Sequence, residues 1–416
     1  MCPAPCDHLS SPATPPLLDI LFIGYGDWHL WTWDGFRTRS AQLCRFLASS
    51  PHVRNVYVLN EPVYLRSPSK GFSIPRARRF RLLPYRSRCY QVTQDIYAID
   101  PSRFLLAPFS WRKRYVIRNL RKHLATLEIS PVLWIANVPM AFLMNEIPCS
   151  LRVFDAIDDW EFIPNLRDNL KIGECYETIS THADIIFTVS EYLADKFKNR
   201  TAGPLVRQVP NGVDLGLFSR AADPPQIRRS NRGQKQPVLT YIGVLSDRFD
   251  FEIAKAVAIT YPECRLLLVG PLQKSEDYRF KPLQALPNVE WRGLVHHSHI
   301  PQILRDSDVL LIPHCVSPLA TSMDPLKLYE YMTTGLPIVA TDVPPMKKYE
   351  QFVSIAKDPP TFVSAVEKAL KEQEMPSAEW LWQARIEEAK RHSWQTRVEH
   401  IIKDMTTILA QKGKLK

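Results

Sequence analysis

Short apolar runs of strand length recur along the chain, and stretches with helical spacing lie between them. In the first half the runs are Leu17–Gly24, Val53–Leu59, Pro131–Ala136, Arg152–Ile157 and Asp184–Val189. In the second half they are Val238–Gly243, Arg265–Gly270, Val289–Gly293, Asp308–Pro313 and Pro337–Thr341. Helical spacing is found in Phe36–Ala48, Ser190–Lys198, Phe251–Ala258, Ile300–Asp306, Pro325–Thr334, Pro360–Lys371 and Trp380–Leu409. Strands that alternate with helices predict an α/β fold with parallel, doubly wound sheets.

The alternation is interrupted near the middle of the chain by a polar stretch rich in proline and arginine. We therefore predict a disordered lead at 1–16, an N-terminal domain at 17–213, a linker at 214–237 and a C-terminal domain at 238–395. Two Rossmann-like domains of this kind face a central crevice, which is the default position for a ligand.

Composition narrows the class of protein. The 416 residues are 45% hydrophobic and 23% charged, which is typical of a globular protein and excludes collagen, coiled coils and wholesale disorder. No apolar run reaches the roughly 18 residues of a spanning helix, and the first 16 residues do not have the pattern of a signal peptide. The eight cysteines form no C-x-x-C pair, which favours reduced thiols in a cytoplasm.

The net charge of +10 is unevenly distributed. Residues 61–125 hold fifteen basic and three acidic side chains, so this region alone exceeds the surplus of the whole chain. Such a face, interleaved with aromatic residues, attracts polyanions such as nucleic acid or an anionic membrane surface, although a merely solvated basic face is the alternative. Because no recognition helix, zinc finger or RNA-binding signature is present, we expect no nucleic acid partner.

The most informative stretch for chemistry is Leu319–Ala340. Asp324 is predicted to cap a helix whose amino end would bind an anion. Lys327 lies in the first turn and can reach a phosphate, and Glu330 lies nearly on the same face, where it can accept hydrogen bonds from ribose hydroxyls. The alternative is a surface lysine and glutamate on an amphipathic helix.

This stretch resembles the nucleotide-binding helix of GT-B glycosyltransferases of the group 1, family 4-like type, which show E-x7-E followed by A-x-G-x-P-V-V-A. Glu330 matches the second glutamate and Thr334–Ala340 the tail, whereas Ser322 replaces the first glutamate. The form P-x-K-x-Y-E-Y is similar to teichuronic-acid-type and xanthan-type polysaccharide glycosyltransferases. The resemblance implies that Ser322, Lys327, Leu328 and Glu330 bind the donor, and the departure at Ser322 leaves inversion or retention open.

Further segments resemble the same family in the same order: Thr188–Ser190, Val209–Asp214, Tyr241–Gly243, Leu268–Pro271, Asn288–Gly293 and Asp306–Pro313. The resemblance implies a GT-B fold and a final helix, 396–416, that crosses back to the N-terminal domain. It also implies a reaction without a metal or other cofactor, in which the donor is a nucleotide sugar, with UDP- and GDP-sugars favoured.

Without a metal, side chains and amides must hold the leaving diphosphate. Besides Lys327, Arg248 is a candidate, unless it forms an ion pair with a neighbouring aspartate. Gly243 lets the backbone approach the phosphate. The resemblance implies main-chain contacts to the base from the segment Gly293, Leu294 and Val295.

An acidic cluster follows the strand Arg152–Ile157. Neighbouring carboxylates raise one another's pKa, which suits general-base work. In the family this strand end carries a His-Asp or Asp-Asp pair near the acceptor, so Asp158 and Asp159 are the candidate catalytic residues; surface acids or a helix cap are the alternative. Asp155 is expected to be structural.

The first loop holds G-x-G without the third glycine of a dinucleotide site. The resemblance makes it an acceptor-side loop, where His29 or Arg39 is a candidate for phosphate contact, although packing or capping is the commoner role.

We therefore expect a cytoplasmic glycosyltransferase, peripheral at the inner face of the cell membrane. It would move a sugar from a nucleotide-diphosphate sugar to a lipid-linked or polysaccharide acceptor in envelope or exopolysaccharide biosynthesis. The alternatives are a nucleotide-sugar 2-epimerase of GT-B fold and a non-catalytic protein that binds nucleotides or polyanions.

Overall fold

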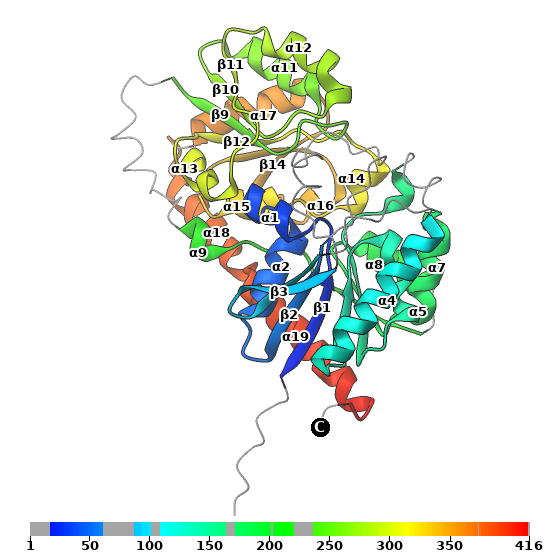
Figure 1. Cartoon of the computed structure of the whole chain (residues 1–416). Coiled ribbons are helices and arrows are strands. Elements are labelled where there is room, and N and C mark those ends of the chain that lie inside the picture. Colours follow the sequence, from blue (N-terminus) through cyan, green and yellow to red (C-terminus); the bar gives the residue numbers. More distant parts are fainter. Residues whose placement is uncertain are drawn as a thin grey trace, which may run out of the picture.

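The computed structural model describes residues 17–60, 87–100, 109–163, 171–200, 203–219, 236–372 and 374–414. Two α/β domains lie one above the other, and the chain returns to the first domain at its C-terminal end (Figure 1). The predicted lead, most of the predicted linker and much of the basic region at 61–125 lie outside the described residues.

The N-terminal domain is built on an eight-stranded sheet of order β3-β4-β2-β1-β5-β6-β7-β8. Its strands are β1 (Leu18–Ile23), β2 (Val53–Leu59), β3 (Arg88–Thr93), β4 (Ile96–Asp100), β5 (Val132–Ile135), β6 (Leu151–Ala156), β7 (Ile185–Thr188) and β8 (Leu205–Gln208). All neighbouring strands run parallel except the β3–β4 pair, which is an antiparallel hairpin at the edge. Because β1 lies between β2 and β5, the strand order reverses there, and doubly wound sheets bind ligands at such a point.

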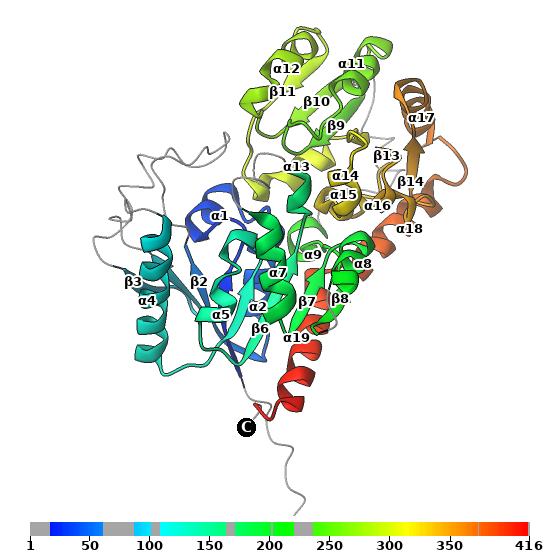
Figure 2. The ribbon, with the colours of Figure 1, turned by 90° about the vertical axis from the view of Figure 1, so that its right-hand side faces the viewer.

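Helices cover both faces of this sheet (Figures 1 and 2). Its helices are α1 (Trp28–Asp34), α2 (Arg39–Ala48), α4 (Phe109–Leu127), α5 (Leu143–Glu146), α7 (Ile172–His182) and α8 (Glu191–Arg200), whereas the short α9 (Leu215–Phe218) packs on the core of the C-terminal domain. One buried cluster joins α2 to β1 and β2, and another joins α4, α5, α7 and α8 to the opposite face. Side chains such as Ile20 and Leu21, adjacent on β1, therefore enter different cores, as alternation along a strand requires.

The C-terminal domain is built on a six-stranded parallel sheet of order β11-β10-β9-β12-β13-β14. Its strands are β9 (Val238–Ile242), β10 (Arg265–Val269), β11 (Val289–Trp291), β12 (Val309–Ile312), β13 (Ile338–Thr341) and β14 (Val353–Ala356). Its helices are α11 (Phe251–Thr260), α12 (Asp277–Gln284), α13 (Ile300–Arg305), α14 (Pro318–Ser322), α15 (Leu326–Met332), α16 (Pro344–Lys347), α17 (Pro359–Glu372) and α18 (Ala378–Arg391). The helices α11, α12 and α17 pack on one face, and α13, α15, α16 and α18 on the other.

The last helix, α19 (Trp394–Gln411), packs on the N-terminal domain rather than on the domain that precedes it. Its buried side chains, including Trp394, Ile401 and Met405, join the cluster formed by α2, β1 and β2. The chain enters α19 through reciprocal hydrogen bonds between Val213 and the 392–394 segment, of 2.9 and 3.1 Å. Figures 1 and 2 show α19 running along the N-terminal domain.

Two boundaries differ from the sequence prediction. Within the stretch of helical spacing at Trp380–Leu409, the final helix begins at Trp394 and not at the expected residue 396, because Ser393 has an extended backbone and caps α19 by accepting a hydrogen bond from the Thr396 N–H at 3.1 Å. The helix predicted to start behind Asp324 begins at Leu326 and has only seven residues. Among the described residues, no helix is long and apolar enough to cross a membrane.

Candidate functional site

A cavity of about 300 Å³ lies between the two domains, at the carboxyl ends of both sheets. Its N-terminal wall comes from the loops after β1 and β6 and the start of α2, with Tyr25, Arg39 and Asp158 among the lining residues. Its C-terminal wall comes from the loops after β9, β10 and β12 and from the start of α15. Both switch points of strand order therefore open onto one cavity, the expected place for a ligand.

Tight turns shape the C-terminal wall. Gly270 follows β10 with a φ of +140°, and a Cβ atom there would lie 1.9 Å from the carbonyl oxygen of Gly243. A Cβ atom on Gly243 would in turn lie 2.6 Å from Nζ of Lys327. Glycine at these two positions therefore leaves room for the Gly243 carbonyl and for the Lys327 ammonium, and the approach of the Gly243 backbone to a phosphate stays a prediction.

Three basic side chains gather on this wall. The Lys327 ammonium lies 3.1 Å from Nε2 of His314 and 3.1 Å from the hydroxyl group of Tyr241, and 4.3 Å from the centroid of the tyrosine ring. The Arg248 guanidinium donates to Sδ of Met323 at 3.3 Å. Neither Lys327 nor Arg248 forms a salt bridge with a carboxylate in the described part of the chain, so the alternative ion pair with Asp247 or Asp250 is not formed.

Burial and mutual repulsion disfavour the charged forms of these groups. Burial, followed by the nearby charge of Arg248, lowers the pKa of Lys327 to about 7. Burial, Lys327 and Arg248 hold the pKa of His314 well below its ordinary value, so His314 is neutral near pH 7. A bound polyanion would relieve this repulsion, which makes the wall a candidate diphosphate site.

Glu330 lies at the same wall but has a protein partner. Its carboxylate accepts a hydrogen bond of 2.8 Å from Nε2 of His297. Burial lowers the pKa of His297, but the field and hydrogen bond of Glu330, with the fields of Asp34 and Asp214, raise it above its ordinary value overall. The sequence did not indicate this partner, because His297 is 33 residues away in the chain.

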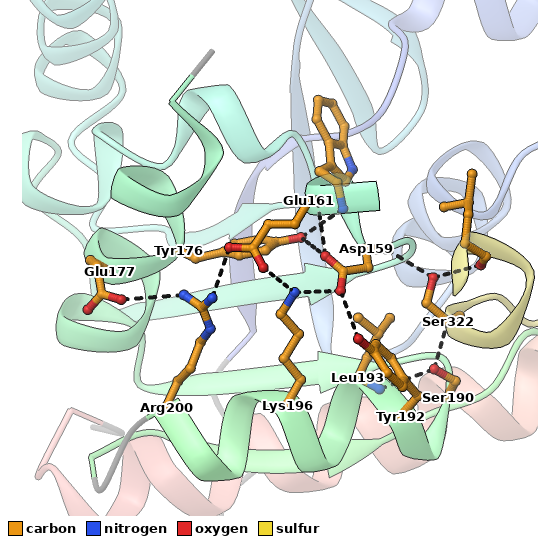
Figure 3. Close-up of polar contacts among 12 residues, drawn as sticks. Asp159, Glu161, Tyr176, Glu177, Ser190, Tyr192, Leu193, Lys196, Arg200 and Ser322 are labelled. Carbon is orange, nitrogen blue, oxygen red and sulfur yellow. Dashed lines mark hydrogen bonds and ion pairs between the residues drawn. The ribbon is translucent and has the colours of Figure 1, made fainter. Parts of the chain in front are cut away.

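The two predicted catalytic carboxylates point to different environments. Asp158 lines the cavity, and burial together with the charge of Asp159 raises its pKa, while Arg248 opposes the rise. Asp159 is fully buried outside the cavity lining and forms an ion pair with Lys196 (Figure 3). Its carboxylate also accepts a hydrogen bond from the Glu161 N–H at 3.1 Å. Asp158 therefore faces the cavity, where the candidate base is expected, whereas Asp159 is ion-paired outside it.

Some of the other residues predicted to bind the donor line the cavity, and others do not. Leu294 and Val295 line the cavity beside Gly293, which has a φ of +63° and does not itself appear in the lining. Leu328 is fully buried in the core of the C-terminal domain. Ser322 is also fully buried and lies outside the lining, with its hydroxyl group bonded to the N-terminal domain. Direct donor contact is thus not supported for Leu328 or Ser322.

Asp324 does not cap α15 as predicted. Its carboxylate accepts hydrogen bonds from the Asn211 N–H at 2.6 Å and from the Tyr329 hydroxyl group at 2.9 Å, and Pro325 occupies the cap position without a side-chain bond. Burial raises the pKa of Asp324, although the hydrogen bonds from Asn211 and Tyr329 oppose the rise. The carboxylate joins the two domains instead of starting the helix.

Arg39 and Asp155 form a buried ion pair beneath the N-terminal wall. Nη2 of Arg39 lies 2.8 Å from Oδ1 of Asp155, and Nη1 donates to the Asn211 side chain at 3.1 Å. Asp155 is structural, as expected. Arg39 is almost fully buried, and His29 pairs with Asp100 at 3.1 Å. Both candidate side chains are thus already paired within the protein, and of the two only Arg39 also lines the cavity.

The sequence is similar to that of known glycosyltransferases. Residues 236–372 match the family described as glycosyl transferases group 1. The chain is 32% identical over 231 residues to TuaH of Bacillus subtilis (strain 168), described as a teichuronic acid biosynthesis glycosyltransferase. The match covers 52% of this chain and 58% of TuaH, so the chain spans little more than half the length of that relative.

Solved structures resemble the whole chain. Sucrose-phosphate synthase from Thermosynechococcus elongatus has a TM-score of 0.70 at 14% identity, over 96% of this chain and 100% of that one. Anabaena HepE in complex with UDP-glucose has a TM-score of 0.65 at 14% identity, over 94% and 100%. These likenesses show the two-domain GT-B fold, and residues 236–372 within it match the family of group 1 glycosyl transferases.

Proposed function

We propose that this chain is a metal-independent glycosyltransferase that takes a sugar from a nucleoside-diphosphate sugar. The observation that carries the proposal is the pair of basic side chains, Lys327 and Arg248, which line the interdomain cavity and have no carboxylate partner among the described residues. A diphosphate released there would be stabilised by both charges as it leaves the sugar. Anabaena HepE, which shares the fold, is described in complexes with UDP and with UDP-glucose.

Asp158 would act on the other substrate. The carboxylate would accept the proton of a hydroxyl group of the acceptor. The oxygen of that hydroxyl group would form a bond to the anomeric carbon of the donor sugar, while the bond from this carbon to the diphosphate breaks. Because the pKa of Asp158 is raised, its carboxylate is a stronger base than an ordinary aspartate.

The acceptor we propose is a lipid-linked or polysaccharide glycan in cell-envelope biosynthesis, reached from the cytoplasmic face of the membrane. The name of TuaH, in teichuronic acid biosynthesis, supports the glycan. The described part of the basic region supports the membrane: Arg114, Arg118 and Lys122 are exposed at four-residue spacing along α4. Each basic residue near anionic lipid contributes on the order of 1 kcal/mol to docking.

The donor site is tested by thermal stabilisation with UDP, GDP, ADP, CMP and dTDP. A ligand at 100 times its Kd stabilises a protein by about 2.7 kcal/mol, which gives a clear shift of the melting temperature. We expect one nucleotide to raise the melting temperature of the unsubstituted protein and of K368M, whose lysine is exposed on α17. The same nucleotide should raise the melting temperature of K327M far less. If none of the nucleotides raised the melting temperature of the unsubstituted protein, the proposal would be contradicted.

The reaction is tested by incubating the protein with the selected donor, with and without lipid-linked glycan acceptors. We expect nucleoside diphosphate release to depend on the acceptor and to be lost in D158N. An altered nucleotide sugar formed without acceptor would instead identify a 2-epimerase, and binding without turnover a non-catalytic protein.

Membrane docking is tested by co-sedimentation with vesicles of phosphatidylcholine and phosphatidylglycerol at moderate salt. We expect the unsubstituted protein to sediment and the R114E/R118E/K122E variant to sediment less. Equal sedimentation of both would remove α4 from the docking surface.

A further inference from the structure

A dense polar cluster surrounds Asp159, outside the lining of the cavity, and Figure 3 shows its contacts. The carboxylate of Asp159 is at its centre, paired with Lys196 and within 3.4 Å of the hydroxyl groups of Tyr176 and Tyr192. Lys196 also binds Glu161 at 2.7 Å. The proposed function uses none of these groups directly.

The cluster is rigid because most of its members are held twice. Arg200 binds Glu161 at 2.8 Å and Glu177 at 3.3 Å, and the Tyr176 hydroxyl group, besides its bond to Asp159, accepts the Trp160 N–H at 3.0 Å. The side chain of Lys196 is only 13% exposed. Charged groups with several partners and little exposure hold one arrangement much more firmly than surface pairs do.

Asp159 is the immediate chain neighbour of the candidate base Asp158. Asp158 lies at a bend, and the backbone of Asp159 that follows is extended, with φ −85° and ψ 101°. The carboxylate of Asp159 is anchored in the cluster, whereas Asp158 lines the cavity. Holding Asp159 in place therefore restricts the backbone that carries Asp158.

The C-terminal domain contacts the same two-residue segment. The hydroxyl group of Ser322 accepts a hydrogen bond of 3.2 Å from the N–H of Asp159, and its carbonyl accepts one of 2.7 Å from the hydroxyl group of Ser190 (Figure 3). Ser322 ends α14, which is joined to the donor-binding Lys327 by a short loop. A segment of the C-terminal domain thus holds the backbone of the N-terminal domain next to Asp158.

We propose that Asp159, Lys196 and Ser322 are positioning residues that together aim the Asp158 carboxylate into the cavity, so that the base is in place only when the two domains are closed on each other. The proposal rests on the proposed function, since it assigns a task to the neighbours of its base. It also gives a reason for serine at 322: a glutamate there would place another carboxylate beside the Asp158–Asp159 pair.

The experiment measures nucleoside diphosphate release from UDP-glucose or GDP-mannose, whichever nucleotide the stabilisation panel selects, with water or glycan as acceptor. We expect S322A, D159N and K196M to lower kcat on the order of 10- to 100-fold, because a small misplacement of a reacting group costs this much. The KM for the donor and the melting shift with nucleotide should stay unchanged. K196R should recover much of the loss, and K198M, on the exposed face of the same helix, should behave as the unsubstituted protein.

The pH profile separates positioning from general loss of structure. Arg248 and Asp159 are the charged groups whose fields reach Asp158. Since Asp159 raises the pKa of Asp158, D159N should move the acidic limb of kcat to lower pH, and S322A should leave it in place. Turnover unchanged in all three variants, with D158N inactive, would overturn the positioning role alone. An active D158N would overturn the base assignment itself, and this role with it.

Discussion

Protonation of Lys327 should control the affinity for the nucleotide sugar. With a pKa of about 7 in the free protein, Lys327 is charged in about half of the molecules at pH 7 and in about a tenth at pH 8. A bound diphosphate favours the charged form and raises this pKa, so binding takes up protons above pH 7. His314 does not add to the effect, because its pKa lies well below this range.

The magnitude follows from these fractions. If the diphosphate binds the charged form, the affinity for UDP-glucose should fall about fivefold from pH 7 to pH 8, with uptake of about half a proton per ligand at pH 7. Isothermal titration calorimetry in two buffers of different ionisation enthalpy measures both quantities. UDP-glucose suits the assay because its diphosphate does not titrate in this range.

The matched comparison is K327M, which keeps the length of the side chain and removes the charge. This variant should bind weakly at both pH values, without the fivefold change and without proton uptake. Binding of UDP-glucose by the unsubstituted protein that is independent of pH, with no proton uptake, would refute the reasoning, since the lysine would then be fully charged or distant from the diphosphate.

Three other perturbations test the framework around the site. R39M leaves the Asp155 carboxylate buried without its partner and should lower the free energy of unfolding by about 3–5 kcal/mol in urea titration; a loss below 1 kcal/mol would show that the pair is not structurally important. E330Q removes the nearest carboxylate that raises the pKa of His297, so NMR titration should find that pKa lower than in the unsubstituted protein; an unchanged value would contradict the contact. I401A removes a fully buried side chain of α19 and should cost about 2–5 kcal/mol, whereas a surface-like loss of a few tenths would mean that α19 does not brace the N-terminal core.

The hydrophobic pattern predicted most of the central strands, because β5 and β12 are fully buried, continuous apolar runs, and β1 and β9 are apolar apart from one polar residue each, Asp19 and Thr240. The β3–β4 hairpin was not predicted, since β3 is an edge strand whose residues are half-buried or exposed and have no long apolar run. Local signals also failed at the Asp324 cap, where a bond from the Asn211 N–H, 113 residues away, takes the carboxylate.

In the candidate site, too, the sequence does not show contacts between residues that are far apart in the chain. Lys327, Arg248 and Asp158 could be predicted, because each follows a recognisable strand or helix signal and all three reach the cavity. The partners His297, Lys196 and Arg39 could not be predicted, since each is selected by the fold and not by chain spacing. The sequence therefore indicated several of the side chains that line the cavity, and the structure shows which of their neighbours already have partners within the protein.

The unpaired cations have a consequence for the stability of the free protein. In the unfolded chain Lys327 has its ordinary pKa near 10.4, whereas folding lowers it to about 7. The folded state therefore binds fewer protons than the unfolded state between these values, and this lysine makes the free protein more stable as the pH rises. With a diphosphate bound, the lysine is charged in the folded state and this dependence disappears. The structure thus carries an unfavourable charge arrangement that the proposed ligand relieves, which is the physical difference between a ligand site and an ordinary buried ion pair such as Arg39–Asp155.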